Sequence, residues 1–223
     1  MKKKLIIITL LGAIISIIIY FYTRSDEITI VALGDGLSIG MTPYDIEGYS
    51  FNDYLKEDYT NKHKLKNYYY EFAQAKCTIK ELIYDIKENK SLIIKNEKVE
   101  IQRAINEADI LTIAIGLDEL AGNKITTSIK NEFQDNITEL LSMIKMLNHN
   151  KVIVLGIYQT TNQDALTIAK INAIIRDVAL SNSFTFIDIT SLSANSKYFL
   201  DKKSHYINYE GHKAIYKEIK KLL

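Results

Sequence analysis

The sequence of 223 residues contains one cysteine, one proline and no tryptophan, and its charges nearly balance. The single cysteine, Cys77, excludes an intrachain disulfide. The net charge of +1 gives no electrostatic reason to expect nucleic acid or an anionic surface as a partner. No internal repeat, low-complexity segment or second domain is visible. Apart from the N-terminal segment, the chain has about 200 residues of ordinary composition. This length and composition predict one globular domain with a substantial core.

Charge is missing from one long stretch near the N-terminus. Lysines at positions 2–4 precede residues 5–22, which carry no charge and are long enough as a helix to span a bilayer core. No small-x-small cleavage site ends the stretch and no cysteine follows it, which favours a retained anchor over a cleaved signal peptide, the alternative, and excludes a lipoprotein. Because the lysines lie before the stretch, we expect a cytoplasmic N-terminus. We therefore predict a membrane anchor in residues 1–27 and an extracellular domain in residues 28–223.

Glycine is scarce, with nine residues in all, but three of the nine lie close together. Gly34, Gly36 and Gly40 follow residues 28–33, an apolar and β-branched run typical of a strand buried on both faces in a parallel sheet. The glycines permit a tight turn at the carboxyl end of that strand. Open α/β sheets bind their ligands at this edge. The sequence therefore predicts a functional loop directly after its first strand.

Strands and amphipathic helices alternate along the rest of the chain. Further strands are expected at 67–72, 109–115, 151–157 and 184–189, and residues 92–99 are ambiguous, with a small hairpin as one solution. Helices are expected from residue 50 and over 78–87, 99–108, 128–148, 164–181 and 209–223. The alternation predicts an α/β domain with a central parallel sheet of about five strands covered on both faces.

The glycine loop reads Gly34-Asp35-Gly36-Leu37-Ser38-Ile39-Gly40. It resembles the first sequence block of the SGNH/GDSL hydrolases, G-D-S-L-(S/T)-x-G, at every position but one. Gly36 stands where that family has its nucleophilic serine. The resemblance implies a flavodoxin-like, three-layer SGNH-hydrolase fold with strand order 2-1-3-4-5 and an ester-hydrolase site at the strand ends. It implies no cofactor.

Two further blocks of the family have partial counterparts. After the second strand, Lys76 falls at the position of the family's oxyanion-hole glycine. After the third strand, the family's I-G-x-N-D-L becomes Ile115-Gly116-Leu117-Asp118-Glu119-Leu120. The family asparagine donates an N–H to the developing oxyanion, and its replacement Asp118 cannot donate when ionised. Asp118 could serve only if its pKa were raised enough to keep it protonated.

The last block, D-x-x-H-P-(N/S)-x-x-G-(H/Y), supplies the base and its orienting acid. Its final positions are matched by Asn208, Gly211 and His212. Counted back from these, the histidine position holds Tyr206 and the aspartate position holds Lys203. His205 and Asp201 lie one and two residues upstream of those positions. We take His205 as the candidate base, and the alternative is a solvated loop histidine with Tyr206 in the family position.

Three hypotheses about function follow. The first is an anchored SGNH-like domain that has lost hydrolysis and binds a small-molecule or glycan ester. Its site would combine the catalytic positions Asp35, Gly36, Gly116, Asp118 and His205 with the ligand contacts Ser38, Lys76 and Glu119. The second is an active esterase or deacetylase of the cell envelope, with His205 as base and a substitute nucleophile, for which Ser38 is the only nearby hydroxyl in the loop. The third is a divalent-metal site built from Asp35, Asp118, Glu119 and His205.

Overall fold

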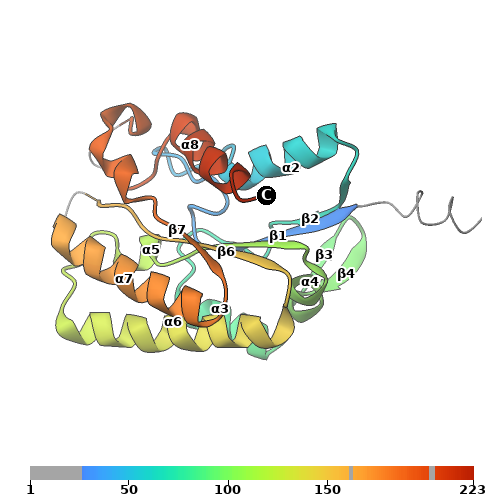
Figure 1. Ribbon diagram of the computed structural model, residues 1–223, viewed down its shortest axis with the longest axis horizontal. Coiled ribbons are helices and arrows are strands. Elements are labelled where there is room, and N and C mark those ends of the chain that lie inside the picture. The colour runs from blue at the N-terminus through green and yellow to red at the C-terminus, as the bar shows by residue number, and fades with distance from the viewer. Residues whose placement is uncertain (1–26, 161–162, 201–203) are drawn as a thin grey trace, which may run out of the picture.

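The computed structural model describes residues 27–160, 163–200 and 204–223. Its centre is a five-stranded parallel sheet in the order β2-β1-β5-β6-β7 (Figure 1). The strands are β1 (Ile28–Gly34), β2 (Leu65–Tyr69), β5 (Ile110–Ala114), β6 (Lys151–Leu155) and β7 (Thr185–Ile187). Counted among the strands of this sheet alone, the order is second, first, third, fourth, fifth. The predicted doubly wound topology is therefore confirmed.

Helices cover both faces of the sheet and complete three layers (Figure 1). On one face α2 (Phe51–Asn61) packs against α8 (Tyr209–Lys220). The other face carries a group of mutually packed helices: α3 (Ile79–Lys87), α4 (Ile101–Glu107), α6 (Thr127–Leu147) and α7 (Ala165–Ser181). Because both faces are covered, β5 is buried along its whole length and β1 from Thr29 onward. This burial explains their nearly continuous apolar sequences.

Local sequence signals mark the first residues of α2 and α3. Ser50 caps α2 by accepting from the Asp53 backbone N–H, and the Asp53 side chain accepts in return from the Ser50 N–H. Thr78 and Glu81 form the same reciprocal capping box at the start of α3. Each box satisfies two of the backbone donors that a helix start leaves without an intrahelical partner. The predicted starts of these two helices are thereby confirmed to within one residue.

The structure corrects several boundaries. The second sheet strand spans Leu65–Tyr69 rather than 67–72, because the chain turns at Tyr70, whose carbonyl accepts from the Ala73 N–H. The ambiguous segment is a hairpin of β3 (Ser91–Ile94) and β4 (Glu97–Glu100). Three short elements were not predicted: α5 (Leu117–Leu120) and the 3₁₀ helices η1 (Thr190–Ala194) and η2 (Ser196–Tyr198).

The predicted membrane-spanning segment, residues 5–22, lies outside the described residues. Among the helices that the structure does describe, none combines the length and the apolar character needed to cross a bilayer.

Candidate functional site

The site predicted at the strand ends lies where the sheet reverses its winding. The chain runs from β1 to β2 on one side and then crosses to β5 on the other, so the loops after these strands leave the sheet at one edge. Open α/β sheets form their ligand crevice at this switch point. The segment that precedes α8 reaches the same edge, because His205 contacts Asp118 in the loop after β5.

The first loop depends on a position that only glycine can occupy. Gly34 has φ of +133°, and a Cβ there would lie 1.8 Å from the Ala114 carbonyl oxygen. The absence of a side chain thus lets the end of β1 run against the end of β5. The next residue, Asp35, is fully buried and accepts from the Leu37 N–H (3.1 Å) and the Asp118 N–H (3.1 Å). Asp35 therefore ties the first loop to the loop after β5.

The surroundings of Asp35 make it a structural carboxyl group. Burial and the neighbouring charge of Asp118 raise the pKa of Asp35 to about 8. Its carboxyl group is 0% exposed, so it offers no oxygen to a ligand in solvent. The predicted site residue Asp35 thus belongs to the site by holding its loops.

Ser38 faces away from the site. Its hydroxyl donates to the Leu33 carbonyl (2.8 Å) and lies 3.2 Å from the Ala114 carbonyl, and the residue is fully buried. These bonds brace the loop against the ends of β1 and β5. The Ser38 hydroxyl thus points into the strand ends rather than toward the predicted site, and it is not placed to replace the missing nucleophile.

Asp118 is the centre of the site. Its Oδ2 accepts from the backbone N–H of Gly36 (3.0 Å) and of Lys76 (2.7 Å). Its Oδ1 lies 2.9 Å from Nε2 of His205, and the carboxylate also interacts with the Tyr206 hydroxyl. The Asp118 side chain is 3% exposed. One carboxylate thus joins residues from the loops after β1, β2 and β5 with the segment before α8.

The hydrogen bonds decide the charge of this carboxylate. Burial works to raise the pKa of Asp118, but the bonds from His205 and from the backbone N–H groups of Lys76 and Gly36 outweigh it and lower that pKa. Asp118 is therefore ionised at neutral pH and can only accept hydrogen bonds. The condition under which it could replace the family asparagine, a raised pKa, is not met.

Two backbone N–H groups converging on one oxygen form the donor pair of an oxyanion hole. Here Gly36 and Lys76 supply the pair, and the oxygen between them belongs to Asp118. In an ester hydrolase with this donor pair, the developing oxyanion of the substrate would lie where the negatively charged Asp118 Oδ2 lies here. An ester carbonyl can enter only if this side chain leaves.

Lys76, predicted to stand at the family's oxyanion-hole glycine position, has a backbone conformation that suits glycine. Its φ of +63° lies in the left-handed region, which glycine adopts without steric cost and other residues rarely adopt. This conformation directs the Lys76 N–H to Asp118, while the lysine side chain is exposed. The loop after β2 therefore keeps the donor although the sequence has lost the glycine.

His205 reaches the site despite its shifted register. Because an ionised carboxylate only accepts, Nε2 of His205 carries the proton and donates to Asp118 Oδ1. The His205 carbonyl accepts from the Tyr158 hydroxyl (2.7 Å), which fixes the backbone at this point. The Nε2 atom of His205 is thus hydrogen-bonded to Asp118. Asp201 and Lys203, the other candidates of this block, lie outside the described residues.

Tyr206 fills the space left by the missing serine side chain. A Cβ built on Gly36 would lie 2.6 Å from the Tyr206 hydroxyl and 2.9 Å from Asp118 Oδ2. Tyr206 is 2% exposed, and its ring lies 4.0 Å from that of His205 between centroids. The sequence signal for this role was the register, which put Tyr206 rather than His205 at the family histidine position. The structure brings both residues to the same carboxylate.

The remaining predicted residues, Gly116 and Glu119, position the backbone around the site. Gly116 has φ of +101° and begins the turn into α5 that carries Asp118. Glu119 accepts from the Ile79 N–H (3.0 Å), so it holds the start of α3. Within the described part of the chain, no group of three histidine, cysteine or acidic side chains is arranged to hold a metal ion. The alternative metal site of Asp35, Asp118, Glu119 and His205 is therefore not formed.

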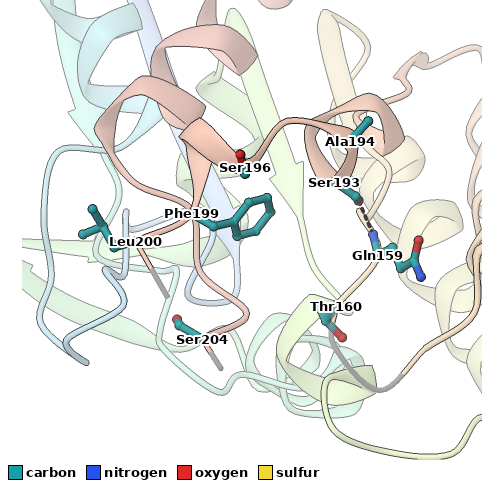
Figure 2. Close-up of a pocket in the computed structure, with 8 residues that line it drawn as sticks. All are labelled: Gln159, Thr160, Ser193, Ala194, Ser196, Phe199, Leu200 and Ser204. Carbon is teal, nitrogen blue, oxygen red and sulfur yellow. Dashed lines mark hydrogen bonds between the residues drawn. The ribbon is translucent and has the colours of Figure 1, made fainter. Parts of the chain in front are cut away.

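A cleft lies beside this centre, and sequence reasoning did not find it. It has a volume of about 590 Å³. Its described lining residues come from the loop after β6, from η1 and η2, and from the chain leading to His205 (Figure 2): Gln159, Thr160, Ser193, Ala194, Ser196, Phe199, Leu200 and Ser204. The cleft adjoins the Asp118 centre through Tyr158, which precedes Gln159, and through Ser204, which accepts from the Tyr206 N–H (3.0 Å).

Sequence comparison finds no matching family model and no matching curated protein. Solved structures do match. A lipase/acylhydrolase from Enterococcus faecalis is 16% identical with a TM-score of 0.63, over 87% of this chain and 96% of that one. A catalytic mutant of Axe2, an acetylxylan esterase from Geobacillus stearothermophilus, is 13% identical with a TM-score of 0.64, over 87% and 93%. LAE5, an alpha/beta hydrolase from the metagenome of Lake Arreo, is 14% identical with a TM-score of 0.61, over 86% and 93%.

These neighbours are hydrolases of the SGNH/GDSL type, and the resemblance seen in the sequence is confirmed at the level of the fold. Identities of 13–16% show the fold alone. What this chain does must therefore be argued from its site.

Proposed function

We propose that this chain, which has the fold of the SGNH/GDSL hydrolases, is a membrane-anchored extracytoplasmic domain that binds an ester or glycan ligand without hydrolysing it. One observation carries the proposal: the ionised Asp118 carboxylate accepts from both backbone donors of the oxyanion hole. A substrate oxyanion would have to displace a like charge from its own donors. That arrangement opposes the transition state of ester hydrolysis.

Two further features support the loss of hydrolysis. A serine nucleophile needs a base within hydrogen-bond reach. Gly36 has no hydroxyl, and the Tyr206 hydroxyl takes up the space beside it. Nε2 of His205 donates to Asp118 and is not free to accept a proton. Gly36 thus leaves no nucleophile, and Asp118 takes up both the base nitrogen and the donors of the oxyanion hole.

The alternative, an active envelope esterase with a substitute nucleophile, has less support. Ser38 donates to two strand carbonyls and is buried beneath the loop. For this serine to act as the nucleophile, its hydroxyl would have to break these hydrogen bonds, turn toward the site and lie within reach of a proton acceptor. The fold of esterases such as the acetylxylan esterase supports an ester or glycan as the class of ligand.

The purified chain should hydrolyse short acyl nitrophenyl esters no faster than a heat-denatured sample. The physical reason is the missing hydroxyl at Gly36 together with the negative charge of Asp118 in the oxyanion hole. Treatment with a fluorophosphonate, followed by mass spectrometry, checks the result independently of substrate choice. The Ser38→Ala variant serves as control and should behave like the native chain. Covalent labelling of the native chain that disappears in Ser38→Ala would overturn the proposal and identify the nucleophile.

Membrane anchoring is tested separately. If residues 5–22 are retained as an anchor with a cytoplasmic N-terminus, protease added to intact cells should digest the domain, which should remain with the membrane fraction before digestion. Immunoblotting of fractions with and without protease provides the measurement. Recovery of the domain in the culture medium with an N-terminus beyond Tyr22 would instead identify a cleaved signal peptide.

A further inference from the structure

The cleft beside the Asp118 centre has the size and lining of a site for an uncharged polar ligand. Its volume of about 590 Å³ is within the range of small-molecule sites. The polar lining residues are Gln159, Thr160, Ser193, Ser196 and Ser204. Among the lining residues that the structure describes, none carries a charge. Hydroxyl and amide groups both donate and accept, so they suit a ligand that is itself rich in hydroxyl groups.

Thr160 supplies a polar atom that needs a partner. The residue is 8% exposed, and its hydroxyl oxygen is buried without a hydrogen bond to any described residue. A buried hydroxyl left unpaired costs about 1–3 kcal/mol. Because Thr160 lines the cleft, a ligand hydroxyl entering there could form the missing bond.

Ser193 is already oriented for a ligand. The Gln159 backbone N–H donates to Ser193 Oγ (2.7 Å), the bond drawn in Figure 2, and it joins the loop after β6 to η1. Since Oγ accepts this bond, the serine's own hydrogen remains to be donated, and the described residues give it no acceptor. The Gln159 side chain is held as well, because its Nε2 donates to the Gln163 carbonyl (2.7 Å).

Phe199 adds an apolar face to this polar lining. Figure 2 shows its ring extending from the chain between η2 and Leu200 toward the side of the cleft formed by Ser193 and Gln159. The ring packs edge to face with that of Tyr158, with centroids 5.7 Å apart. Tyr158 is fully buried and bonds the His205 carbonyl, so it holds the Phe199 ring in place. A rigid aromatic ring beside hydroxyl and amide groups matches a sugar, whose ring has an apolar face and a rim of hydroxyl groups.

We propose that this cleft binds a neutral oligosaccharide, with one sugar ring against Phe199 and its hydroxyl groups bonded to Thr160 and Ser193. The proposal names the class of ligand for the proposed function. It rests on that function in one respect, which is that the bound sugar is not hydrolysed. The cleft shares two segments with the Asp118 centre, at Tyr158 and at Ser204 to Tyr206.

The test measures binding of defined trisaccharides to the purified full chain by isothermal titration calorimetry. The detergent must lack a sugar headgroup, because maltoside or glucoside would compete for the cleft. The neutral probes are triacetylchitotriose, xylotriose and maltotriose, and the anionic comparator is trigalacturonate. We expect saturable binding of at least one neutral probe and weaker or no binding of the anionic one.

Variants locate the binding in the cleft. Phe199→Ala should weaken binding of that neutral probe at least tenfold, and Phe199→Tyr should largely preserve it. Thr160→Val keeps the side-chain shape, removes the hydroxyl and should weaken binding severalfold. The matched control is Tyr84→Ala, which deletes an aromatic ring that is 64% exposed on α3 and does not line the cleft. Its binding should equal that of the native chain, and circular dichroism confirms that each variant is folded.

Three results would overturn the inference: no saturable binding of any neutral probe, tighter binding of trigalacturonate, or equal effects of Phe199→Ala and Tyr84→Ala. These results are distinguishable from failure of the proposed function. A chain that binds a trisaccharide in the cleft and also reacts with a fluorophosphonate keeps the cleft assignment and loses the non-hydrolytic one. A chain that does neither keeps the loss of hydrolysis and loses the ligand class.

Discussion

The triple variant Gly36→Ser/Asp118→Asn/Tyr206→Ala should hydrolyse short acyl nitrophenyl esters that the native chain leaves intact. Serine at position 36 supplies the nucleophile. Asparagine at 118 removes the negative charge that lies between the Gly36 and Lys76 N–H groups and supplies a side-chain donor. Alanine at 206 clears the hydroxyl that would otherwise lie 2.6 Å from the new Cβ. With Asp118 neutralised, His205 Nε2 is free to accept the proton of the serine.

The contribution of each substitution to the gain in esterase rate can be measured separately. Loss of one oxyanion-hole donor costs about a hundredfold to a thousandfold in rate. The variant that retains Asp118, Gly36→Ser/Tyr206→Ala, should therefore be at least about a hundredfold slower than the triple variant. Gly36→Ser/Asp118→Asn should also be slower, because Tyr206 crowds the new side chain.

The control for this prediction is His205→Ala in the triple variant, which should abolish the gain because the serine loses its proton acceptor. Initial rates of nitrophenol release, with circular dichroism to confirm folding, decide the matter. Activity that persists without His205 would show that this histidine is not the base. A folded triple variant with no activity would show that the loops have moved beyond what these three side chains can restore.

Acid should remove the part of the chain's stability that depends on a neutral His212. This residue lies on α8, is 2% exposed and stacks on Phe51 with ring centroids 6.2 Å apart. Neither ring nitrogen has a hydrogen-bond partner among the described residues. Burial lowers the pKa of His212 to about 3. The folded chain therefore keeps this imidazole neutral at pH values where the unfolded chain protonates it.

The direction of the effect follows from proton binding. Between the unfolded pKa of 6.5 and the folded pKa of about 3, the unfolded state binds one more proton at this position. The contribution of neutral His212 to the free energy of unfolding is thus complete above pH 6.5. Below pH 6.5 this contribution falls by about 1.4 kcal/mol per pH unit. At pH 4 the accumulated loss is about 3 kcal/mol. Asp35 acts in the opposite direction, because its raised pKa makes stability fall as pH rises from about 4 to about 8.

The His212→Leu variant isolates this contribution. Urea unfolding of the native chain and the variant from pH 7 to pH 4 should show that the variant gains about 3 kcal/mol over the native chain across this range. The Asp35 contribution cancels in the difference. The matched control is His149→Leu, the same substitution at an exposed histidine, whose curve should run parallel to that of the native chain. Parallel curves for His212→Leu as well would show that His212 is not neutral in the folded state.

The sequence by itself determined the architecture. The apolar run of β1, the alternation of strands with amphipathic helices, and the cap residues Ser50 and Thr78 are local signals, and each element they predict is present. Periodicity and capping act within a few residues, so they can be read without knowing what lies nearby in space. The substitutions at Gly36 and Asp118 were equally visible, because a motif is read position by position. Boundaries that depend on a turn, such as the end of β2 at Tyr69, were not.

Only the tertiary structure decided what the altered site does. The partners of Asp118 are Gly36 and Lys76, which lie 82 and 42 residues before it, and His205, 87 residues after it. Their meeting depends on how three strand-end loops and the chain before α8 come together at the sheet edge. The same convergence sets the charge of Asp118, since burial and hydrogen bonds oppose each other there and their balance requires coordinates. It also turns Ser38 inward, brings Tyr206 against Gly36 and forms the cleft around Phe199. Of these three features, only the position of Tyr206 had a signal in the sequence, the register of the last block.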